Sequence, residues 1–335
     1  MERRRVALDT RAGPVRVGVI GAGAMGSCHA RLVAGEVPGA EVAAVADVSL
    51  DRARALAHEV QAARAHRDGH ELIASPEVDA VIVASIPDSH EALVRACLQA
   101  GKPVLCEKPL APSADAGRRI LEAEAAAGAR LVRLGFMRRY DEGYVELKRR
   151  LDRGEIGAPL LVHCVHRNAD IPDSFDQRAA ITDSVVHEVD VTRWLLGEEI
   201  ASVAVVAGRP TRNAPQGVRD PQVVLLETER GVVVDVESFV RARYGYDVRC
   251  EVVGETGTLA LPRPPAVTSG FQDRFAQAYR DELRAWVDDL RAGTASGPSA
   301  RDGYAASAVT DACVRAAQTG RRVDVAMTSS SDHRF

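Results

Sequence analysis

A glycine-rich turn between an apolar run and a helical stretch is the feature that most constrains the fold. Residues 15–20 (VRVGVI) are apolar and rich in β-branched side chains, which predicts a buried parallel strand. Gly21, Gly23 and Gly26 follow with the spacing GxGxxG, and a helical stretch begins at Met25. In a dinucleotide-binding turn these glycines permit, in order, the tight turn, the close approach of a pyrophosphate and the packing of helix on strand. The helix N-terminus then supplies N–H donors to the phosphates.

The second predicted strand ends in an acidic residue. Residues 41–46 (EVAAVA) form this strand, and Asp47 follows it. A carboxylate at that point can accept the ribose hydroxyls of the adenosine half of the cofactor and would repel a 2′-phosphate. Val48 and Ser49 carry no positive charge, so the sequence favours NAD over NADP. The alternative is that Asp47 caps the next helix, a role for which Ser49 competes.

Strands and helices alternate through the first part of the chain. Further strands are expected at 80–85, 103–106 and 130–134, helices at 90–100 and 113–127, and a short strand and helix within 62–75. This alternation predicts a doubly wound parallel sheet that binds its ligand at the carboxyl ends of the strands. The segments 85–87 and 107–109 both follow such ends. We therefore expect the cofactor to contact Gly21, Ala22, Gly23, Ala24, Met25, Gly26, Asp47, Ser85, Ile86, Pro87, His90, Glu107, Lys108 and Met137.

The pattern changes to longer strands after about residue 135. Strands are expected at 160–167, 202–209, 223–228, 231–240, 247–253 and 258–261, and helices at 142–153, 183–196, 273–291 and 303–319. This pattern predicts an α/β domain with an open, largely antiparallel sheet, covered on one face by helices. The other face needs a partner, which favours a homo-oligomer. The expected division is an N-terminal extension (1–14), a Rossmann domain (15–135), a substrate-binding and oligomerisation domain (136–325) and a C-terminal tail (326–335).

Composition narrows the class of protein. The chain has 335 residues, 46% of them apolar, which is enough for two cores. With 43 Lys and Arg against 47 Asp and Glu, the formal charge of −4 gives no overall basic character to attract nucleic acid or anionic lipid. No apolar run reaches the ~18 residues of a membrane span, and the charged N-terminus lacks the apolar segment of a secretory signal. The six cysteines show no CxxC spacing, which is typical of a reducing cytoplasm.

Three residues predict the chemistry of an alcohol dehydrogenase. Asp183 and His187 are four residues apart on a predicted helix and share one face. A carboxylate beside an imidazole orients the ring and raises its basicity, as removal of a hydroxyl proton requires. The Lys108 ammonium can stabilise the developing alkoxide. The alternatives are a helix cap for Asp183 and a core histidine for His187. No metal site is predicted, since Val191 stands where a HExxH motif has its second histidine.

These motifs together resemble the Gfo/Idh/MocA oxidoreductases. The resemblance rests on the GAGAMG turn with Asp47, on Glu107-Lys108-Pro109 and on the pair Asp183 and His187. Within that family, nearly the whole chain is similar to the inositol 2-dehydrogenases. The segments that carry this similarity are 136–141 with 143–144, 162–168, 182–190, 244–247, 302–304 and 311–313.

The resemblance implies a Rossmann domain followed by a C-terminal α/β domain, NAD as cofactor, a homotetramer and the oxidation of myo-inositol to 2-keto-myo-inositol. It implies a catalytic group of Lys108, Asp183 and His187, with His187 as the base. It further implies that substrate hydroxyls bind to Arg138, His166, Asn168 and one of Tyr244 or Tyr246. From the residues alone, Arg138 could equally be a surface charge and His166 an outward strand residue.

Two alternatives to this function stay open. An enzyme for another inositol isomer, an aminocyclitol or an amino sugar of antibiotic biosynthesis would carry the same core residues. A non-catalytic dinucleotide-binding regulator is the alternative from another class. Loss of Lys108 or His187 would indicate such a regulator, and both residues are present.

Overall fold

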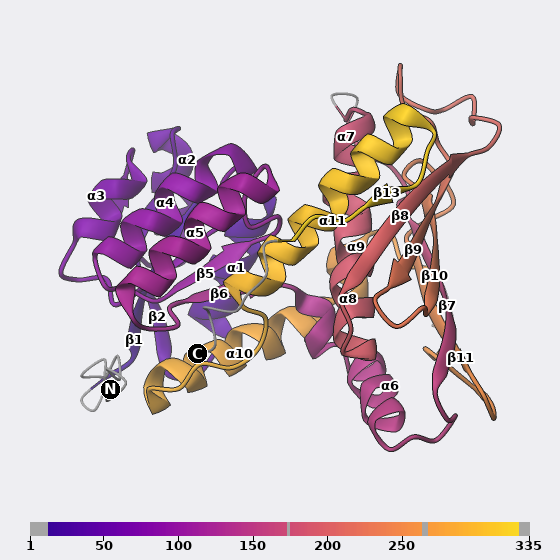
Figure 1. Cartoon of the computed structure of the whole chain (residues 1–335). Coiled ribbons are helices and arrows are strands. Elements are labelled where there is room, and N and C mark those ends of the chain that lie inside the picture. The colour runs from indigo at the N-terminus through magenta and orange to yellow at the C-terminus, as the bar shows by residue number, and fades with distance from the viewer. Residues whose placement is uncertain (1–12, 173–174, 263–266, 328–335) are drawn as a thin grey trace. The chain divides into compact units, whose positions relative to one another are not determined.

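The computed structural model describes residues 13–172, 175–262 and 267–327. They divide into two compact units, each with its own sheet (Figure 1). The first unit consists of residues 13–136 and 279–304, and the second of 137–278 and 305–327, within the described ranges. The expected second domain was continuous, whereas residues 279–304 pack with the first unit. Residues 1–12 of the expected extension and 328–335 of the expected tail lie outside the described residues.

The first unit is built on a six-stranded parallel sheet with the order β3-β2-β1-β4-β5-β6. Its strands are β1 (Val15–Ile20), β2 (Ala40–Ala46), β3 (Arg64–His66), β4 (Ala80–Val83), β5 (Val104–Glu107) and β6 (Val132–Gly135). Strands β4, β5 and β6 are buried along their whole length, as expected of a parallel sheet with both faces covered. The strand order reverses at β1, so the carboxyl end of β1 is where a dinucleotide crevice belongs.

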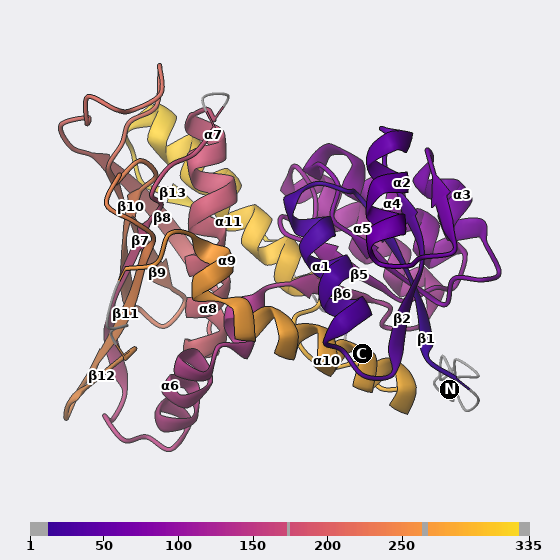
Figure 2. The ribbon, with the colours of Figure 1, turned by 180° about the vertical axis from the view of Figure 1, so that it is seen from behind.

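Helices cover both faces of this sheet. They are α1 (Ala24–Gly35), α2 (Leu50–Glu59), α3 (Gly69–Ala74), α4 (Pro87–Gln99), α5 (Ala114–Ala127) and most of α10 (Ala276–Ala292). Helices α4 and α5 lie on the face seen in Figure 1, and α1 lies on the face seen in Figure 2. Ser49 is the N-cap of α2, and its side chain accepts a hydrogen bond from the Arg52 N–H. The alternative role of Asp47 as the cap of that helix is therefore wrong.

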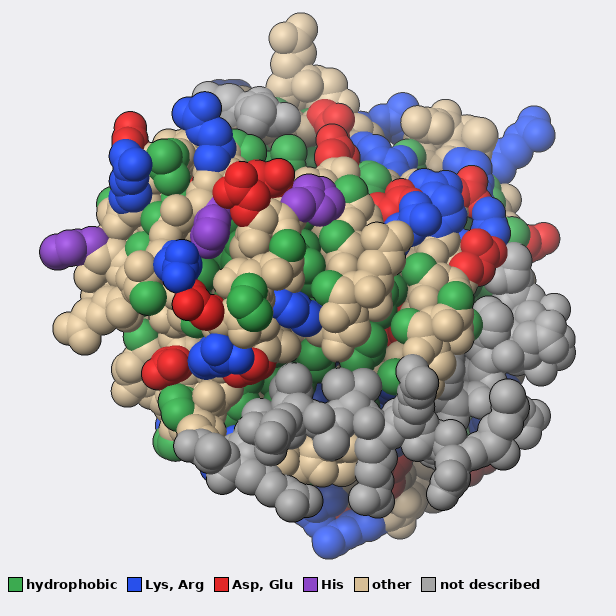
Figure 3. Space-filling view, turned by 90° about the vertical axis from the view of Figure 1, so that its left-hand side faces the viewer, with side chains coloured by type: hydrophobic (Ala, Val, Ile, Leu, Met, Phe, Trp, Pro, Cys, Tyr) green, Lys and Arg blue, Asp and Glu red, His purple; other side chains and the backbone are tan. Residues whose placement is uncertain are grey.

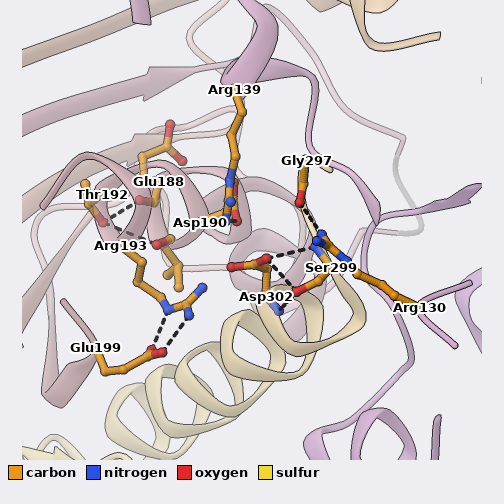
Figure 4. A network of polar contacts seen from close by, with 11 residues as sticks. Arg130, Arg139, Glu188, Asp190, Thr192, Arg193, Glu199, Gly297, Ser299 and Asp302 are labelled. Atoms are coloured by element: carbon orange, nitrogen blue, oxygen red, sulfur yellow. Dashed lines mark hydrogen bonds and ion pairs between the residues drawn. The ribbon is translucent and has the colours of Figure 1, made fainter. Parts of the chain in front are cut away.

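The outer edge of β6 is covered by a segment from far along the chain. Leu134 N–H donates to the Pro298 carbonyl oxygen at 3.1 Å, and Arg133 forms an isolated β-bridge with Ser299. The Arg130 guanidinium donates to the Gly297 carbonyl oxygen at 2.5 Å (Figure 4). These contacts explain why the segment around residue 298 belongs to the first unit.

The second unit is built on a seven-stranded sheet with the order β12-β11-β7-β10-β9-β8-β13. Its strands are β7 (Pro159–Arg167), β8 (Ile200–Ala207), β9 (Gln222–Thr228), β10 (Val233–Phe239), β11 (Asp247–Gly254), β12 (Thr258–Ala260) and β13 (Val323–Asp324). Strands β7 and β10 pair in parallel and the remaining neighbours pair antiparallel. The predicted fold class, a Rossmann domain with a second, largely antiparallel α/β domain, is confirmed. The short strand β13 has no counterpart in the prediction.

Helices of the second unit lie on one face of its sheet (Figures 1 and 2). They are the 3₁₀ turn η2 (Met137–Tyr140), α6 (Glu142–Asp152), α7 (Gln177–Ala179), the π-helical segment η3 (Ala180–Val185), α8 (Val186–Leu196), α9 (Phe271–Arg274) and most of α11 (Ala300–Thr319). The opposite face carries no helix among the described residues. Helix α8 is buried nearly all round, so its side chains are fixed by packing.

The predicted helix at 183–196 is longer and less regular than expected. The helical segment begins at Gln177 with Asp176 as its N-cap, passes through the π-helical turn and continues as α8. Asp183 lies within the π-helical turn, so the alternative role of Asp183 as a helix cap is wrong.

Candidate functional site

The glycine turn of the first unit has the backbone geometry that a dinucleotide requires. Gly21 has φ +102°, and a Cβ there would collide with the Ala84 carbonyl oxygen. A Cβ on Gly26 would collide with the carbonyl oxygen of Gly21. A Cβ on Gly23 would meet nothing within 4 Å, so this side of the turn is open to an approaching phosphate.

Helix α1 starts at this turn, and its N-terminus suits the binding of a phosphate. Its N-cap, Gly23, makes no side-chain capping bond, which leaves the first N–H groups of α1 for an anion. Ala22, Ala24 and Met25, which were also predicted to contact the cofactor, lie in the turn and the first residues of α1. The residues present thus fit the pyrophosphate of a dinucleotide.

Asp47 lies at the carboxyl end of β2 and is bonded to the glycine turn. Its Oδ2 accepts from the Ala22 N–H at 2.8 Å, and its Oδ1 accepts from the Ser49 N–H at 2.8 Å and from Arg52 Nη2 at 2.9 Å. Burial raises the pKa of this carboxyl, but the three hydrogen bonds outweigh burial and hold the pKa below its usual value. Asp47 is therefore an anion at the carboxyl end of β2, and its predicted contact with the cofactor ribose stays a prediction. Arg52 lies beyond Val48 and Ser49, the two residues on which the expected preference for NAD rested, and was missed.

The loops after β4 and β5 meet around a buried histidine. His90 Nδ1 lies 2.8 Å from the Pro109 carbonyl oxygen, and its Nε2 lies 3.1 Å from the Ser85 carbonyl oxygen. Burial lowers the pKa of His90, which favours the neutral ring. His90 thus links the two loops through its own ring, and its predicted contact with the cofactor stays a prediction. Ile86 and Pro87 begin α4, and the Ile86 side chain is exposed.

Glu107 is directed into the first unit. Its Oε1 lies 2.7 Å from Nε2 of His29 on α1, and its Oε2 accepts from the Lys108 N–H at 3.1 Å. Burial raises the pKa of Glu107, and the hydrogen bond and charge of His29 with the Lys108 charge outweigh burial, so the pKa lies below its usual value. Glu107 therefore ties β5 to α1 and fixes the backbone that carries Lys108. The Lys108 side chain is partly exposed, and the Lys108–Pro109 peptide bond is cis.

His187 and Asp183 lie in the second unit, on the helical segment that contains the π-helical turn. His187 is buried on the first turn of α8, and Asp183 is half-buried about one turn before it. Hydrogen bonds in a π-helix run from residue i to i+5, and such turns are frequent at functional sites. A π-helical turn therefore contains Asp183, where a regular helix was expected.

A buried ionic cluster lies beside His187. Arg138 is 1% exposed and forms an ion pair with Glu188, which is also 1% exposed. Nδ1 of His166 lies 2.9 Å from Glu188 Oε2, and the His166 ring centre is 6.1 Å from that of His187. The Arg138 guanidinium also lies 5.6 Å from the Phe275 ring centre.

Burial raises the pKa of Glu188, but Arg138 and His166 outweigh burial and lower it. Both alternatives, a surface charge at Arg138 and an outward His166, are wrong. Arg138 faces a buried carboxylate, and Glu188 is a residue of the cluster that the sequence analysis missed.

The two candidate tyrosines differ in their surroundings. Tyr246 is 4% exposed, and its ring centre lies 5.8 Å from that of His166. Tyr244 is 55% exposed. Nδ2 of Asn168 donates to Ser184 Oγ at 3.4 Å, which places the amide beside the π-helical turn. The structure therefore groups Tyr246 and Asn168 with His166.

Helix α8 is braced by further polar contacts (Figure 4). Arg139 binds Asp190 through two hydrogen bonds of 2.9 and 2.5 Å. The Thr192 hydroxyl donates to the Glu188 carbonyl oxygen at 2.6 Å. The Arg139–Asp190 contact ties η2 to the helix that carries His187. Met137, a predicted cofactor contact, is buried in η2 of the second unit, and that contact stays a prediction.

The described ranges hold neither a metal-binding group nor a membrane-spanning helix. No three His, Cys, Asp or Glu side chains there form a group that could hold a metal ion. Within the same ranges, every helix is too short or too polar to cross a membrane. The face in Figure 3 carries basic and acidic side chains interspersed with apolar ones.

Comparison with protein-family models assigns both parts of the chain. Residues 15–136 match the model described as oxidoreductase family, NAD-binding Rossmann fold. Residues 144–260 match the model described as GFO/IDH/MocA C-terminal domain.

Curated proteins and solved structures match almost the whole chain. Inositol 2-dehydrogenase 1 of Saccharopolyspora erythraea is 52% identical over 93% of this chain and 96% of its own length. Inositol 2-dehydrogenase of Burkholderia cenocepacia is 49% identical over 93% of this chain and 97% of its own length. The structure of myo-inositol dehydrogenase from Lactobacillus casei in complex with NAD(H) and myo-inositol matches with a TM-score of 0.92 and 36% identity. The match covers 95% of this chain and 99% of that one. The chain belongs to the Gfo/Idh/MocA family of NAD-dependent oxidoreductases.

Proposed function

We propose that this protein oxidises myo-inositol to 2-keto-myo-inositol with NAD. The observation that carries the proposal is identity of about half over nearly full length to inositol 2-dehydrogenases, with Lys108, Asp183 and His187 all present. The retained lysine and histidine disfavour a non-catalytic regulator.

The proposed mechanism gives each of the three catalytic residues a separate role. The chemistry that bound NAD would supply is an acceptor for the hydride of the carbinol carbon. The His187 imidazole accepts the hydroxyl proton, and the Asp183 carboxylate orients that imidazole. The Lys108 ammonium donates a hydrogen bond to the oxygen as negative charge develops on it. Proton and hydride leave the same H–C–O–H group, and a ketone remains.

Substrate recognition is assigned to polar residues of the second unit. We propose that His166, Asn168 and Tyr246 bind ring hydroxyls, since they are grouped near His187. A site built from hydrogen-bonding groups rejects analogues that lack a hydroxyl, because its own polar groups would be left unpaired. A cyclitol with a hydroxyl on each carbon suits such a site. Arg138 contributes by holding His166 through Glu188, and Tyr244 is the weaker candidate.

The experiment is the formation of NADH, followed by absorbance, with a panel of polyols. The panel contains myo- and scyllo-inositol, inosamines, amino sugars and hexoses. We expect myo-inositol to give the highest kcat/KM. A higher value for an inosamine or amino sugar would reassign the substrate. No NADH with any of these compounds, in protein that binds NADH, would overturn the assignment as a polyol dehydrogenase.

We further propose a homotetramer in the cytoplasm. The helix-free face of the second sheet exposes Leu161, Val206, Val223 and Val233, and register places Leu161 beside Val233 and Val206 beside Val223. Exposed apolar side chains on a sheet face favour burial against another copy. The six cysteines are free thiols, which suits a reducing compartment. Light scattering on the native protein and a Val223→Glu variant tests the assembly, and a native monomer would contradict it.

A further inference from the structure

Asp47 and Arg52 are neighbours with opposite effects on the choice between NAD and NADP. In Rossmann domains an acidic residue after the second strand binds the ribose 2′-hydroxyl of NAD, and a nearby arginine accommodates the 2′-phosphate of NADP. This chain has both residues. Arg52 Nη2 lies 2.9 Å from Asp47 Oδ1, and Arg52 Nε lies 3.2 Å from the same atom.

We propose that Arg52 is a latent ligand for the cofactor 2′-phosphate, and that Asp47 alone holds it out of that role. The preference for NAD then depends on one carboxylate. The proposal concerns only the adenosine end of the Rossmann site, so it stands or falls independently of the polyol that the protein oxidises.

The hydrogen bonds of Asp47 show how the two residues share the site. Oδ2 accepts one bond, from the Ala22 N–H, and keeps capacity for a ribose hydroxyl. Oδ1 already accepts from the Ser49 N–H and from Arg52. Arg52 therefore fixes the carboxylate in the orientation that presents Oδ2. As long as this ion pair is present, Asp47 is the anionic partner of Arg52.

A 2′-phosphate next to Asp47 would lie within reach of the same guanidinium. The Arg52 side chain is 59% exposed and the Asp47 side chain 7%, so Arg52 can change rotamer without leaving a cavity. A guanidinium binds phosphate through two parallel hydrogen bonds, which a carboxylate cannot offer. Without the Asp47 charge, Arg52 has the phosphate as its anionic partner. In the native chain Arg52 offsets part of the Asp47 charge, so NADP is bound weakly and is not fully excluded.

The test measures binding of NADH and NADPH by nicotinamide fluorescence, without any polyol. Four proteins form a cycle: the native chain, Asp47→Ser, Arg52→Ala and the double variant. We expect Asp47→Ser to bind NADPH about 10- to 100-fold more tightly than the native chain, the range of one or two hydrogen bonds to a charged group. The double variant should lose this gain. Arg52→Ala alone should weaken NADPH binding more than NADH binding.

Two controls separate this effect from damage to the turn. Asp47→Asn keeps an oxygen acceptor for the Ala22 N–H, so it replaces Asp47→Ser in the cycle if that variant unfolds or no longer binds NADH. Arg31→Ala removes another exposed arginine of the first unit, which is paired with Glu59 at 2.6 Å, and should leave the NADPH gain intact. The gain should also shrink as salt rises, since the contact is exposed.

Either of two results would overturn the proposal. One is an unchanged NADPH affinity in Asp47 variants that still bind NADH. The other is an NADPH gain that survives the Arg52→Ala substitution. Neither result depends on turnover of inositol.

Discussion

Glu188 Oε2 lies 2.9 Å from His166 Nδ1, and the same carboxylate pairs with the buried Arg138 guanidinium. An ionised carboxylate only accepts, so Nδ1 of His166 carries the proton that it donates. In the neutral ring, Nε2 is then an acceptor. Arg138 Nη2, 3.3 Å from the same Nδ1, cannot donate to a protonated nitrogen and serves as the counter-charge of Glu188. The cluster therefore fixes the tautomer of a residue that we assign to substrate binding.

Glu188→Gln should destabilise the protein by about 3–5 kcal/mol, because it leaves the Arg138 charge buried without its partner. Unfolding in urea measures this loss. The double variant Arg138→Met with Glu188→Gln should be less destabilised than Glu188→Gln alone. Glu59→Gln, which removes half of an exposed pair, should change little. Equal stability of Glu188→Gln and the native chain would contradict a stabilising role for the Arg138–Glu188 ion pair.

Stability should fall in acid through Glu188. Its pKa is lowered in the folded protein, so its contribution is complete above the unfolded value of about 4.3 and is lost as pH falls through the lower folded value. The free energy of unfolding, measured in urea between about pH 6 and 3, should therefore decline, and the decline should be shallower in Glu188→Gln. Parallel curves for the two proteins would rule out this contribution.

The three glycines of the turn should respond differently to alanine. Gly23→Ala adds a methyl into open space, so thermal stability should be retained while NADH binding weakens by at least about tenfold, the effect of displacing a phosphate from its hydrogen bonds. Gly26→Ala drives a methyl into the Gly21 carbonyl and should lower the melting temperature. Thermal melting and NADH fluorescence check both variants. Unchanged NADH affinity in Gly23→Ala would argue against a pyrophosphate at this position.

Lys108→Ala and His187→Ala should each reduce kcat by about 10²–10⁴-fold, the usual contribution of an acid–base group, while NAD binding persists. Lys102→Ala is the matched control, since Lys102 belongs to the same unit and its Nζ donates to the Ser75 carbonyl oxygen. Stopped-flow or steady-state NADH formation measures the loss. Near-native rates in either variant would refute the assigned role.

Tyr246→Phe and Tyr244→Phe form a matched pair. Tyr246 packs beside His166, so loss of its hydroxyl should raise KM for myo-inositol by about tenfold, as expected for one hydrogen bond. Tyr244 is exposed, and its substitution should leave KM within about twofold. Steady-state kinetics on both variants decides the assignment, and the reverse pattern would transfer the role to Tyr244.

Local patterns predicted the first unit well. The β-branched runs 15–20 and 80–85, and the glycines between strand and helix, each agree with the strands and turns of the sheet. Such features are encoded within a few neighbouring residues. Arg52 was missed although it stands only five residues after Asp47, because helical geometry brings it back to the carboxylate.

Features of the second unit that depend on distant residues were less predictable. Arg138 and Glu188 are fifty residues apart, and only the folded chain shows that each is the other's counter-charge. The parallel pairing of β7 with β10 inside an otherwise antiparallel sheet is likewise not encoded in either strand. The π-helical turn at Ala180–Val185 reads in sequence as an ordinary helix.

The covering of β6 by the segment around Pro298 has a consequence for how the polypeptide is made. Residues 137–278 are synthesised between β6 and the segment that covers it, so β6 leaves the ribosome with its outer edge bare. A gene fragment that stopped at residue 136 would keep that edge open to edge-to-edge aggregation. A stand-alone nucleotide-binding fragment therefore has to be built by splicing residues 279–304 onto it.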